Sequence, residues 1–113
     1  MSTLVRLQLL RIGDVVAQAA AHADHWLTEV ERQQFAAMRA QARRDSFIAG
    51  HWQARQLAAQ QLGVAWQRIS LHTHADGRPR LCVDASDAPL QLSISHSGDW
   101  LALAVAEAAV GVD

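Results

Sequence analysis

The polar cluster Ser95-His96-Ser97 interrupts an apolar segment near the end of the chain and is the strongest local sign of chemistry. We expect a strand to end at Ser95 and the turn Ser97-Gly98-Asp99 to follow, so that His96 projects at the edge of a sheet. Such turns form anion-binding concavities, and a histidine can donate a hydrogen bond to a phosphate oxygen. These residues leave two interpretations open: a phosphate contact, or serines that only stabilise a turn.

A serine hydrolase site is not favoured by this cluster. Neighbouring positions on a strand point to opposite faces, so Ser95 and His96 cannot easily form a nucleophile and its base. The sequence also lacks the Gly-x-Ser-x-Gly pattern that exposes the serine of α/β-hydrolases. We therefore set hydrolysis aside.

Asp113 places a carboxylate directly after the apolar segment Val110-Gly111-Val112, which we expect to be a strand. Desolvating a carboxylate without a partner is costly, so the group needs a counter-charge. Mg²⁺ would serve, because it commonly takes one or two protein carboxylates together with substrate phosphates and water. One carboxylate is not a complete site, and we expect a second ligand in sequence beyond Asp113.

The remaining histidines do not have the spacing of a zinc site. His22 and His25 are three positions apart, and His72 and His74 are two apart, without companion Cys or His residues at zinc-finger spacing. We expect surface or packing roles for these four side chains. We expect His51 to be a half-buried helix residue.

Several arginines could bind phosphate through the planar donor fork of the guanidinium group. They are Arg39, Arg43, Arg44 and Arg55, in or beside a long predicted helix, and Arg78, in a predicted turn. Each one alone is most simply a solvated surface charge. A cluster with His96 would favour phosphate binding.

The composition indicates a globular protein of one domain or part of one. Half of the 113 residues are hydrophobic and 19% are charged. The formal charge of -1 excludes a field that would gather nucleic acid or anionic membrane, so we expect neither partner. The N-terminus has no long apolar run, so we expect no signal peptide and no membrane span. The single cysteine, Cys82, fits a reducing compartment such as the cytoplasm, and we expect it to be a buried hydrophobic residue.

The first half of the chain predicts one strand and three helices. A strand over about residues 4–10 precedes a short helix that Asp14 could cap and that reaches about Ala23. Thr28 and Glu31 have the spacing of a capping box and begin a helix that runs to about Met38. The longest helical pattern covers about residues 41–62, with Gly63 at its C-terminal cap.

The second half changes to a period of two and predicts short strands. Residues 69–73 and 81–83 flank the hairpin sequence 75–78, and further strands are expected at 90–95, 101–105 and 110–112. Residues 84–89 are the expected mobile loop. The order predicts an α+β fold with a mostly antiparallel sheet packed on the long helix.

Four motifs in order resemble the 4'-phosphopantetheinyl transferase superfamily, in particular the larger Sfp-type enzymes, over about residues 26–113. The segment from Ser93 to Trp100, followed by 110–113, resembles the signature of a strand, a Ser-His-Ser-like turn, an aromatic-led strand and Gly-Val-Asp. Residues 76–79 resemble the Gly-Lys-Pro turn, with Arg78 in place of lysine. Residues 28–32 are similar to the start of the first conserved helix, and 43–55 to the helix that ends in an arginine.

The resemblance implies transfer of the phosphopantetheine arm of coenzyme A to a serine of an acyl or peptidyl carrier protein, with Mg²⁺ at the pyrophosphate. By position, Asp113 would bind Mg²⁺, and His96, with Ser95 beside it, would contact a coenzyme phosphate. Arg78 would face the phosphate region. Arg43 or Arg44 would contact the 3'-phosphate.

The resemblance also implies that residues 1–113 are the N-terminal subdomain of a two-half phosphopantetheinyl transferase. The family's acidic residue two positions after the Asp and its Trp-x-x-Lys-Glu-type motif do not occur in residues 1–113. We therefore expect activity in the full-length protein and little or none in this chain. Glu31, Gln33 and Gln34 replace basic residues that some relatives carry. Two alternatives remain: a half domain that self-associates to complete the site, and a non-catalytic interaction module that retains the fold.

Overall fold

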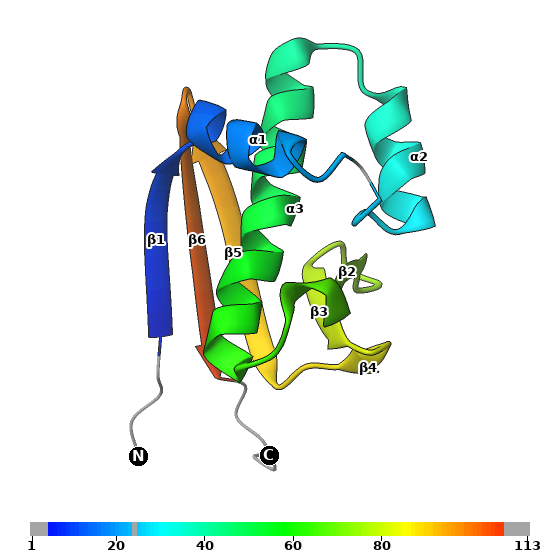
Figure 1. Ribbon diagram of the computed structural model, residues 1–113, viewed down its shortest axis with the longest axis vertical. Helices are drawn as coiled ribbons and strands as arrows, with labels where there is room; N and C mark the ends of the chain where they lie inside the picture. Colours follow the sequence, from blue (N-terminus) through cyan, green and yellow to red (C-terminus); the bar gives the residue numbers. More distant parts are fainter. Residues whose placement is uncertain (1–4, 24, 108–113) are drawn as a thin grey trace.

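The computed structural model describes residues 5–23 and 25–107. In chain order the elements are β1 (Val5–Arg11), α1 (Ile12–Ala20), α2 (Glu29–Ala37), α3 (Gln41–Leu62), the 3₁₀ helix η1 (Trp66–Arg68), β2 (Ile69–Thr73), β3 (Pro79–Val83), β4 (Ser86–Asp87), β5 (Leu90–Ser97) and β6 (Trp100–Glu107) (Figure 1). Among these residues no helix is both long and apolar enough to cross a membrane.

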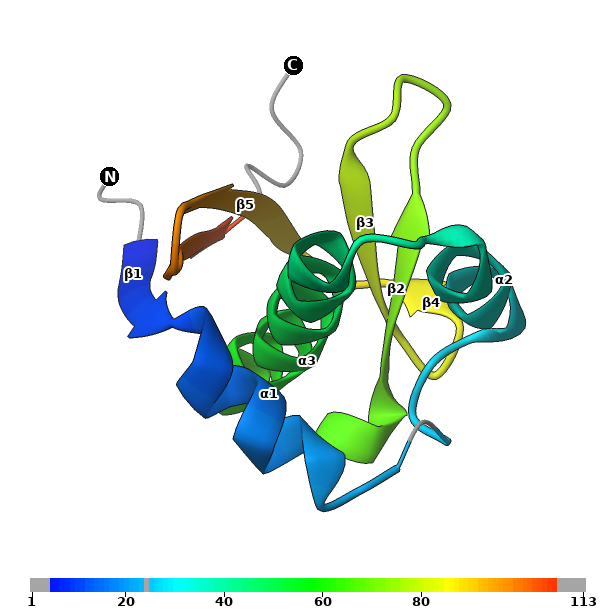
Figure 2. The same cartoon turned by 90° about the horizontal axis from the view of Figure 1, so that it is seen from above.

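The strands form two antiparallel sheets of three strands each. One sheet has the order β1-β6-β5 and the other has the order β2-β3-β4. The long helix α3 lies between them and contacts β6, β5, β2 and α1 (Figure 2). The predicted α+β fold, with antiparallel strands packed on the long helix, is confirmed, although the strands divide into two sheets.

Helix α3 has the predicted bounds and carries much of the core. Trp52, Leu57 and the helix's buried alanines belong to one core cluster with residues of both sheets; these alanines are Ala49, Ala54, Ala58 and Ala59. Gly63 ends the helix with φ +67°, a left-handed conformation that glycine adopts without a steric penalty. At Gly50 an added Cβ would lie 3.2 Å from Cγ2 of Ile94, so a glycine here lets the helix backbone approach β5 closely.

The β1-β6-β5 sheet has one covered face and one open face. Leu101, Leu103 and Val105 alternate along β6 and are buried in the core. The opposite face carries the exposed side chains Val5, Leu7, Leu9 and Trp100. The strict alternation in β6 confirms the period-two pattern of the sequence.

Helix α1 begins and ends earlier than predicted. Its first residue is Ile12, its N-cap is Arg11, and no side chain caps it, so the prediction of an Asp14 cap was wrong. Asp14 lies inside the first turn, where its charge still complements the helix dipole. The helix ends at Ala20 and does not reach Ala23, which has φ 54°.

Two further boundaries differ from the predictions. β5 continues to Ser97 because Ser97 pairs with Trp100 across the hairpin. The expected loop at 84–89 contains the short strand β4, which pairs with β3. Cys82 is buried, as predicted. The predicted strand 110–112 and Asp113 lie outside the described residues.

Candidate functional site

His96 and Ser95 lie on opposite faces of β5. His96 is opposite Leu101, which is buried, so its side chain is on the face that packs against α3. Ser95 is opposite Ala102, on the open face. Both side chains are exposed. This register confirms that the two residues cannot act together as a nucleophile and its base.

The turn after β5 is tied to the start of the first helix. The backbone N–H of Ile12 donates to the carbonyl oxygen of Asp99 at 2.8 Å. The guanidinium of Arg11 lies 4.8 Å from the ring centroid of Trp100, a cation–π distance. The β5-β6 turn beside His96 is therefore held in place by the β1-α1 junction.

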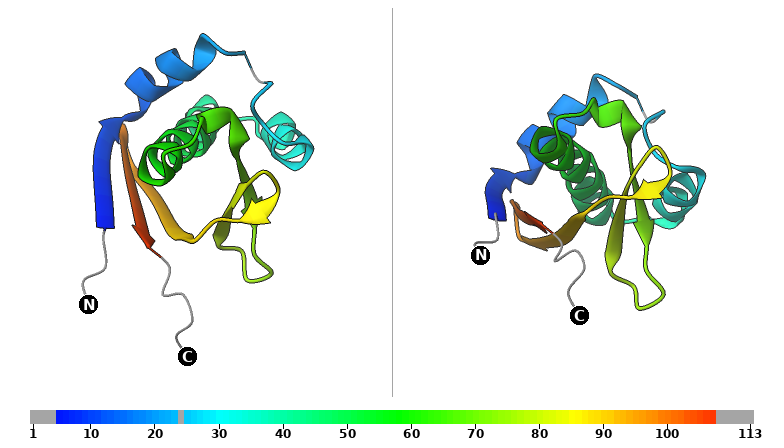
Figure 3. Two further views of the ribbon diagram at one scale, coloured as in Figure 1. Left: turned by 60° about the horizontal axis from the view of Figure 1, so that its bottom comes forward. Right: turned by 90° about the horizontal axis from the view of Figure 1, so that it is seen from below.

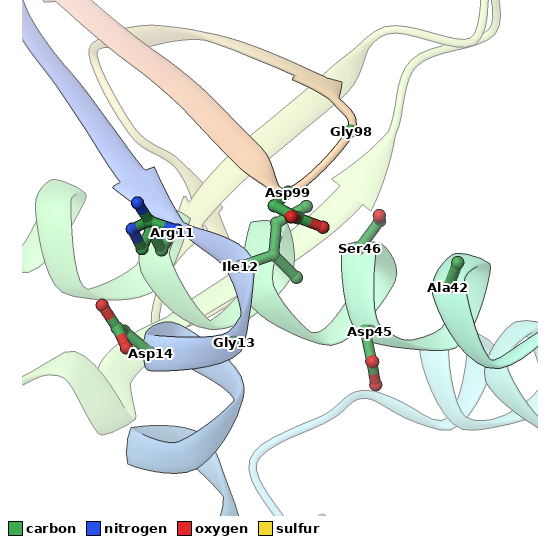
Figure 4. A pocket seen from close by; sticks show the side chains of 9 residues that line it. All are labelled: Arg11, Ile12, Gly13, Asp14, Ala42, Asp45, Ser46, Gly98 and Asp99. Atoms are coloured by element: carbon green, nitrogen blue, oxygen red, sulfur yellow. The ribbon is translucent and has the colours of Figure 1, made fainter.

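A cavity of about 360 Å³ opens at this end of the molecule (Figure 4). Its lining residues are Arg11, Ile12, Gly13, Asp14, Ala42, Asp45, Ser46, Gly98 and Asp99. Asp45 and Ser46 project from α3 in different directions (Figure 4). Within the part of the chain that the structure describes, no three or more His, Cys, Asp or Glu side chains are arranged to hold a metal ion.

The two candidate arginines at the start of α3 differ in their surroundings. The Nη1 of Arg44 donates to the carbonyl oxygens of Phe35 at 3.1 Å and Met38 at 3.0 Å, and the guanidinium lies 3.9 Å from the Phe35 ring centroid. Arg44 therefore links α3 to the end of α2. Arg43 is exposed, next to Ala42 of the cavity lining.

Arg78 projects from the tip of the β2-β3 hairpin and is 73% exposed. The backbone N–H of Arg78 donates to Asp76 Oδ1 at 3.1 Å, and its Nε donates to Oδ2 at 2.8 Å. These contacts, the backbone hydrogen bond first, lower the pKa of Asp76. Asp76 thereby offsets part of the positive charge of Arg78.

The five predicted site residues within the described ranges come from three separate places. Arg43 and Arg44 begin α3, Arg78 lies at the hairpin tip, and Ser95 and His96 end β5. Among residues 5–23 and 25–107, no hydrogen bond or ion pair joins any two of them. The sixth predicted residue, Asp113, lies outside these ranges.

A buried cluster of Glu31, His51 and Arg55 was not predicted. Arg55 is 1% exposed and Glu31 is 2% exposed, so the expectation that Arg55 is a solvated surface charge was wrong. Glu31 Oε1 accepts from the Thr28 backbone N–H at 2.7 Å and from Arg55 Nη2 at 2.5 Å. Oε2 accepts from Arg55 Nη1 at 3.0 Å and from His51 Nδ1.

The cluster keeps Glu31 ionised. Burial raises the pKa of this carboxyl, but the hydrogen bonds from His51 and Arg55 and the charge of Arg55 outweigh that effect and lower the pKa from 4.5 to about 2. His51 and Arg55 are four positions apart and share one face of α3, a signal present in the sequence. Only the packing of α2 shows that the face receives a carboxylate.

The cluster borders a second cavity of about 270 Å³, between α2 and the β2-β3 hairpin. Figures 2 and 3 show α2 beside this hairpin. The lining residues are Val30, Glu31, Gln34, His51, Leu71, His72, Thr73 and Arg80. The cavity therefore gathers two histidines and an arginine from three elements.

Comparisons with known proteins agree on one family. The family model described as 4'-phosphopantetheinyl transferase, N-terminal, matches residues 16–108. The human L-aminoadipate-semialdehyde dehydrogenase-phosphopantetheinyl transferase is 38% identical over 69 residues, which make up 58% of this chain and 22% of that protein. The holo-[acyl-carrier-protein] synthase of Shouchella clausii is 29% identical over 105 residues, 88% of this chain and 89% of that protein.

The fold is also similar to a solved structure. The crystal structure of a holo-(acyl-carrier-protein) synthase from Bacillus anthracis in complex with CoA (3',5'-ADP) has a TM-score of 0.71 at 20% identity, and the match covers 93% of this chain and 96% of that one. At this identity the similarity concerns the fold alone. Since the family model matches most of the 113 residues, the chain belongs to the 4'-phosphopantetheinyl transferase superfamily.

Proposed function

We propose that the full-length protein transfers 4'-phosphopantetheine from coenzyme A to a serine of an acyl or peptidyl carrier protein. The observation that carries this proposal is the family match over residues 16–108, which includes Arg43, Arg78, Ser95 and His96. Relatives named as holo-[acyl-carrier-protein] synthase, and a neighbouring structure in complex with CoA (3',5'-ADP), support the same activity.

In this reaction the serine oxygen forms a bond to the phosphorus of the phosphopantetheine arm. The P–O bond of the pyrophosphate breaks, 3',5'-ADP leaves, and the serine proton is released. Charge builds up on the phosphate oxygens, so the protein contributes mainly positive charge and hydrogen-bond donors. His96 would donate to a coenzyme phosphate, with Ser95 beside it. Arg78 would face the phosphates, and Arg43 would contact the 3'-phosphate because Arg44 already binds two backbone carbonyls.

Asp113 would be a ligand of Mg²⁺, which neutralises pyrophosphate charge when bound. Within the described ranges no group of three His, Cys, Asp or Glu side chains is arranged to hold a metal ion. The donor set fits Mg²⁺ only as one carboxylate joined by coenzyme phosphates, water and groups from elsewhere, which is a common arrangement for this ion.

Residues 1–113 would form the N-terminal subdomain of a cytoplasmic enzyme built from two halves. The family model carries the description N-terminal, and the match to the human relative spans 22% of that protein. The chain alone would then have little activity, because the second half contributes the remaining residues of the site.

A transfer assay tests the proposal. The full-length protein, an apo carrier protein and coenzyme A with a fluorescent label on its thiol should give labelled carrier protein and 3',5'-ADP. His96→Ala and Asp113→Asn should each lower kcat/KM about tenfold or more, the scale of a lost charged hydrogen bond. His25→Ala, an exposed histidine of the loop before α2, serves as the matched control.

Two results would contradict the proposal. Absence of transfer by the full-length protein to any acyl or peptidyl carrier protein, with the fold intact, would refute the activity and favour an interaction module. Transfer by the 113-residue chain at the rate of the full-length protein would refute the two-half arrangement and favour self-association.

A further inference from the structure

We propose that Arg11 and Trp100 are positioning residues for the coenzyme contact at His96. The guanidinium of Arg11 lies 4.8 Å from the ring centroid of Trp100, and Trp100 begins β6 directly after the turn that follows β5. This cation–π contact holds the end of the β5-β6 hairpin closed. The inference rests on the proposed function, since it takes His96 as a coenzyme contact, and it extends that function to two residues outside the proposed site.

The end of this hairpin buries no side chain of its own. Residues 95–100 are all exposed, and the first buried residue after them is Leu101. The turn residues Gly98 and Asp99 also line the cavity of about 360 Å³, so one side of the turn faces open space (Figure 4). A segment with so few buried apolar contacts opens locally at a small cost in free energy. The position of His96 therefore depends on contacts that come from outside the hairpin.

One outside contact comes from the backbone at the start of α1. The N–H of Ile12 donates to the carbonyl oxygen of Asp99 at 2.8 Å, and the side chain of Ile12 is buried in the core. The first N–H groups of a helix have no partner within the helix, so the turn satisfies a donor that would otherwise be free. This hydrogen bond fixes Asp99 but does not involve the last strand pair, Ser97 and Trp100.

The second contact acts on that last pair. In the strand register, Trp100 lies between Arg11 of β1 and Ser97 of β5. Within the part of the chain that the structure describes, the Arg11 guanidinium forms no ion pair, although the cavity lining beside it contains three aspartates. Its contact with the indole ring thus links the edge strand β1 to the pair that closes the hairpin.

The pair acts on His96 through the backbone and not through a shared ligand. Trp100 and Arg11 face the open side of the sheet, whereas His96 is opposite Leu101 and faces the side of α3. Side chains on opposite faces of one sheet point away from each other. Arg11 and Trp100 are therefore positioning residues, and the coenzyme contact remains His96.

Coenzyme kinetics of the full-length protein test the pair. Arg11→Gln and Trp100→Leu should each raise the KM for coenzyme A about two- to fivefold, the factor that an exposed cation–π contact contributes to an equilibrium. The kcat should change less, because bound coenzyme holds the hairpin end closed again. Arg11→Lys and Trp100→Phe keep the cation and the aromatic ring, so both should retain most of the original KM.

Arg6→Gln is the matched control, because it removes the same charge from the same strand. Arg6 is exposed, pairs with Val105 far from the turn, and donates through Nε to Gln61 Oε1 of α3. The KM of this variant should not change. A rise in KM equal to that of Arg11→Gln, or a rise for Arg11→Gln without one for Trp100→Leu, would overturn the proposal, since either result assigns the effect to charge alone.

Double variants test whether the pair acts through His96. Arg11→Gln combined with Trp100→Leu should raise the Kd of coenzyme A no more than either change alone, because both remove one contact. In the His96→Ala background neither change should raise this Kd further. Additive losses in either combination would overturn the positioning role.

Amide hydrogen exchange gives a readout that does not require transfer. In the full-length protein without coenzyme, the amides of Ser97 and Trp100 should exchange about two- to fivefold faster in Arg11→Gln and Trp100→Leu, and that of Leu103 should not change. Unchanged exchange at the hairpin end would overturn the proposal, and so would faster exchange with an unaltered Kd for coenzyme A. If exchange and Kd respond as expected but no carrier protein is modified, only the proposed function is refuted.

Discussion

Replacing Glu31 with glutamine should destabilise the chain more than any surface ion-pair change. Glu31→Gln keeps the shape of the side chain but removes the charge that compensates buried Arg55, which is 1% exposed. Arg55 Nε has no hydrogen-bond partner within the described part. The guanidinium donates to Glu31 through Nη1 and Nη2 and to the carbonyl oxygen of His51 through Nη1, so Glu31 is the charged group among its hydrogen-bond acceptors. Breaking one side of a buried ion pair costs about 3–5 kcal/mol.

The free energy of unfolding measured in urea by circular dichroism tests this value. The expected loss is large compared with the total free energy of unfolding of a typical domain, about 5–15 kcal/mol. The urea concentration at the midpoint of unfolding should therefore fall strongly. The double variant Glu31→Gln/Arg55→Met should lose less than the sum of the single variants, because no unpaired buried charge remains. Asp84→Asn is the matched control, since the Arg68–Asp84 pair is about half exposed and should contribute less than about 1 kcal/mol.

One outcome would refute this account of the cluster. If Glu31→Gln costs no more than Asp84→Asn, Arg55 is solvated in solution and the cluster does not anchor α2. Additive losses in the double variant would likewise show that Glu31 and Arg55 are not coupled.

Three further predictions follow from the same contacts. The pKa of Glu31 is lowered from 4.5 to about 2, which corresponds to a contribution of about 3 kcal/mol to the free energy of unfolding. This contribution is complete above pH 4.5 and is lost as the pH falls toward 2. Acid unfolding curves of the unmodified chain should show this loss, and those of Glu31→Gln should not. Gly63→Ala should lower the free energy of unfolding by about 1 kcal/mol, and with it the thermal midpoint, because the φ of Gly63 is +67°. Gly13→Ala should raise the thermal midpoint, because Gly13 lies in a helix with open space around it. Leu101→Ala should cost about 2–5 kcal/mol in urea unfolding, and the exposed Leu7→Ala less than about 0.5 kcal/mol; equal effects would contradict the assigned faces of the sheet.

Local sequence was sufficient where neighbouring residues supply the interaction. The capping box of Thr28 and Glu31 begins α2, because the two residues satisfy each other's backbone N–H groups. Gly63 ends α3 for a reason contained in one residue. The alternation of Leu101 and Leu103 fixes the buried face of β6.

Strand pairing and the junction between β1 and α1 decided two boundaries that the sequence predicted wrongly. β5 ends at Ser97, not Ser95, because Trp100 pairs with it. Asp14 is not a cap because β1 continues directly into α1 at Ile12. These boundaries depend on partners whose positions only the folded chain defines.

The motif around His96 and the turn at Arg78 were sufficient to predict the family from sequence alone. The residue types of these motifs and their order along the chain can be read without knowing where the fold places them. The charge state and burial of Glu31, His51 and Arg55 were decided only by tertiary structure. Glu31 and Arg55 are 24 positions apart, and the sequence between them carries no periodic signal that brings them together. A buried charge is stable only beside its counter-charge, and packing α2 on α3 is what places the carboxylate against the guanidinium.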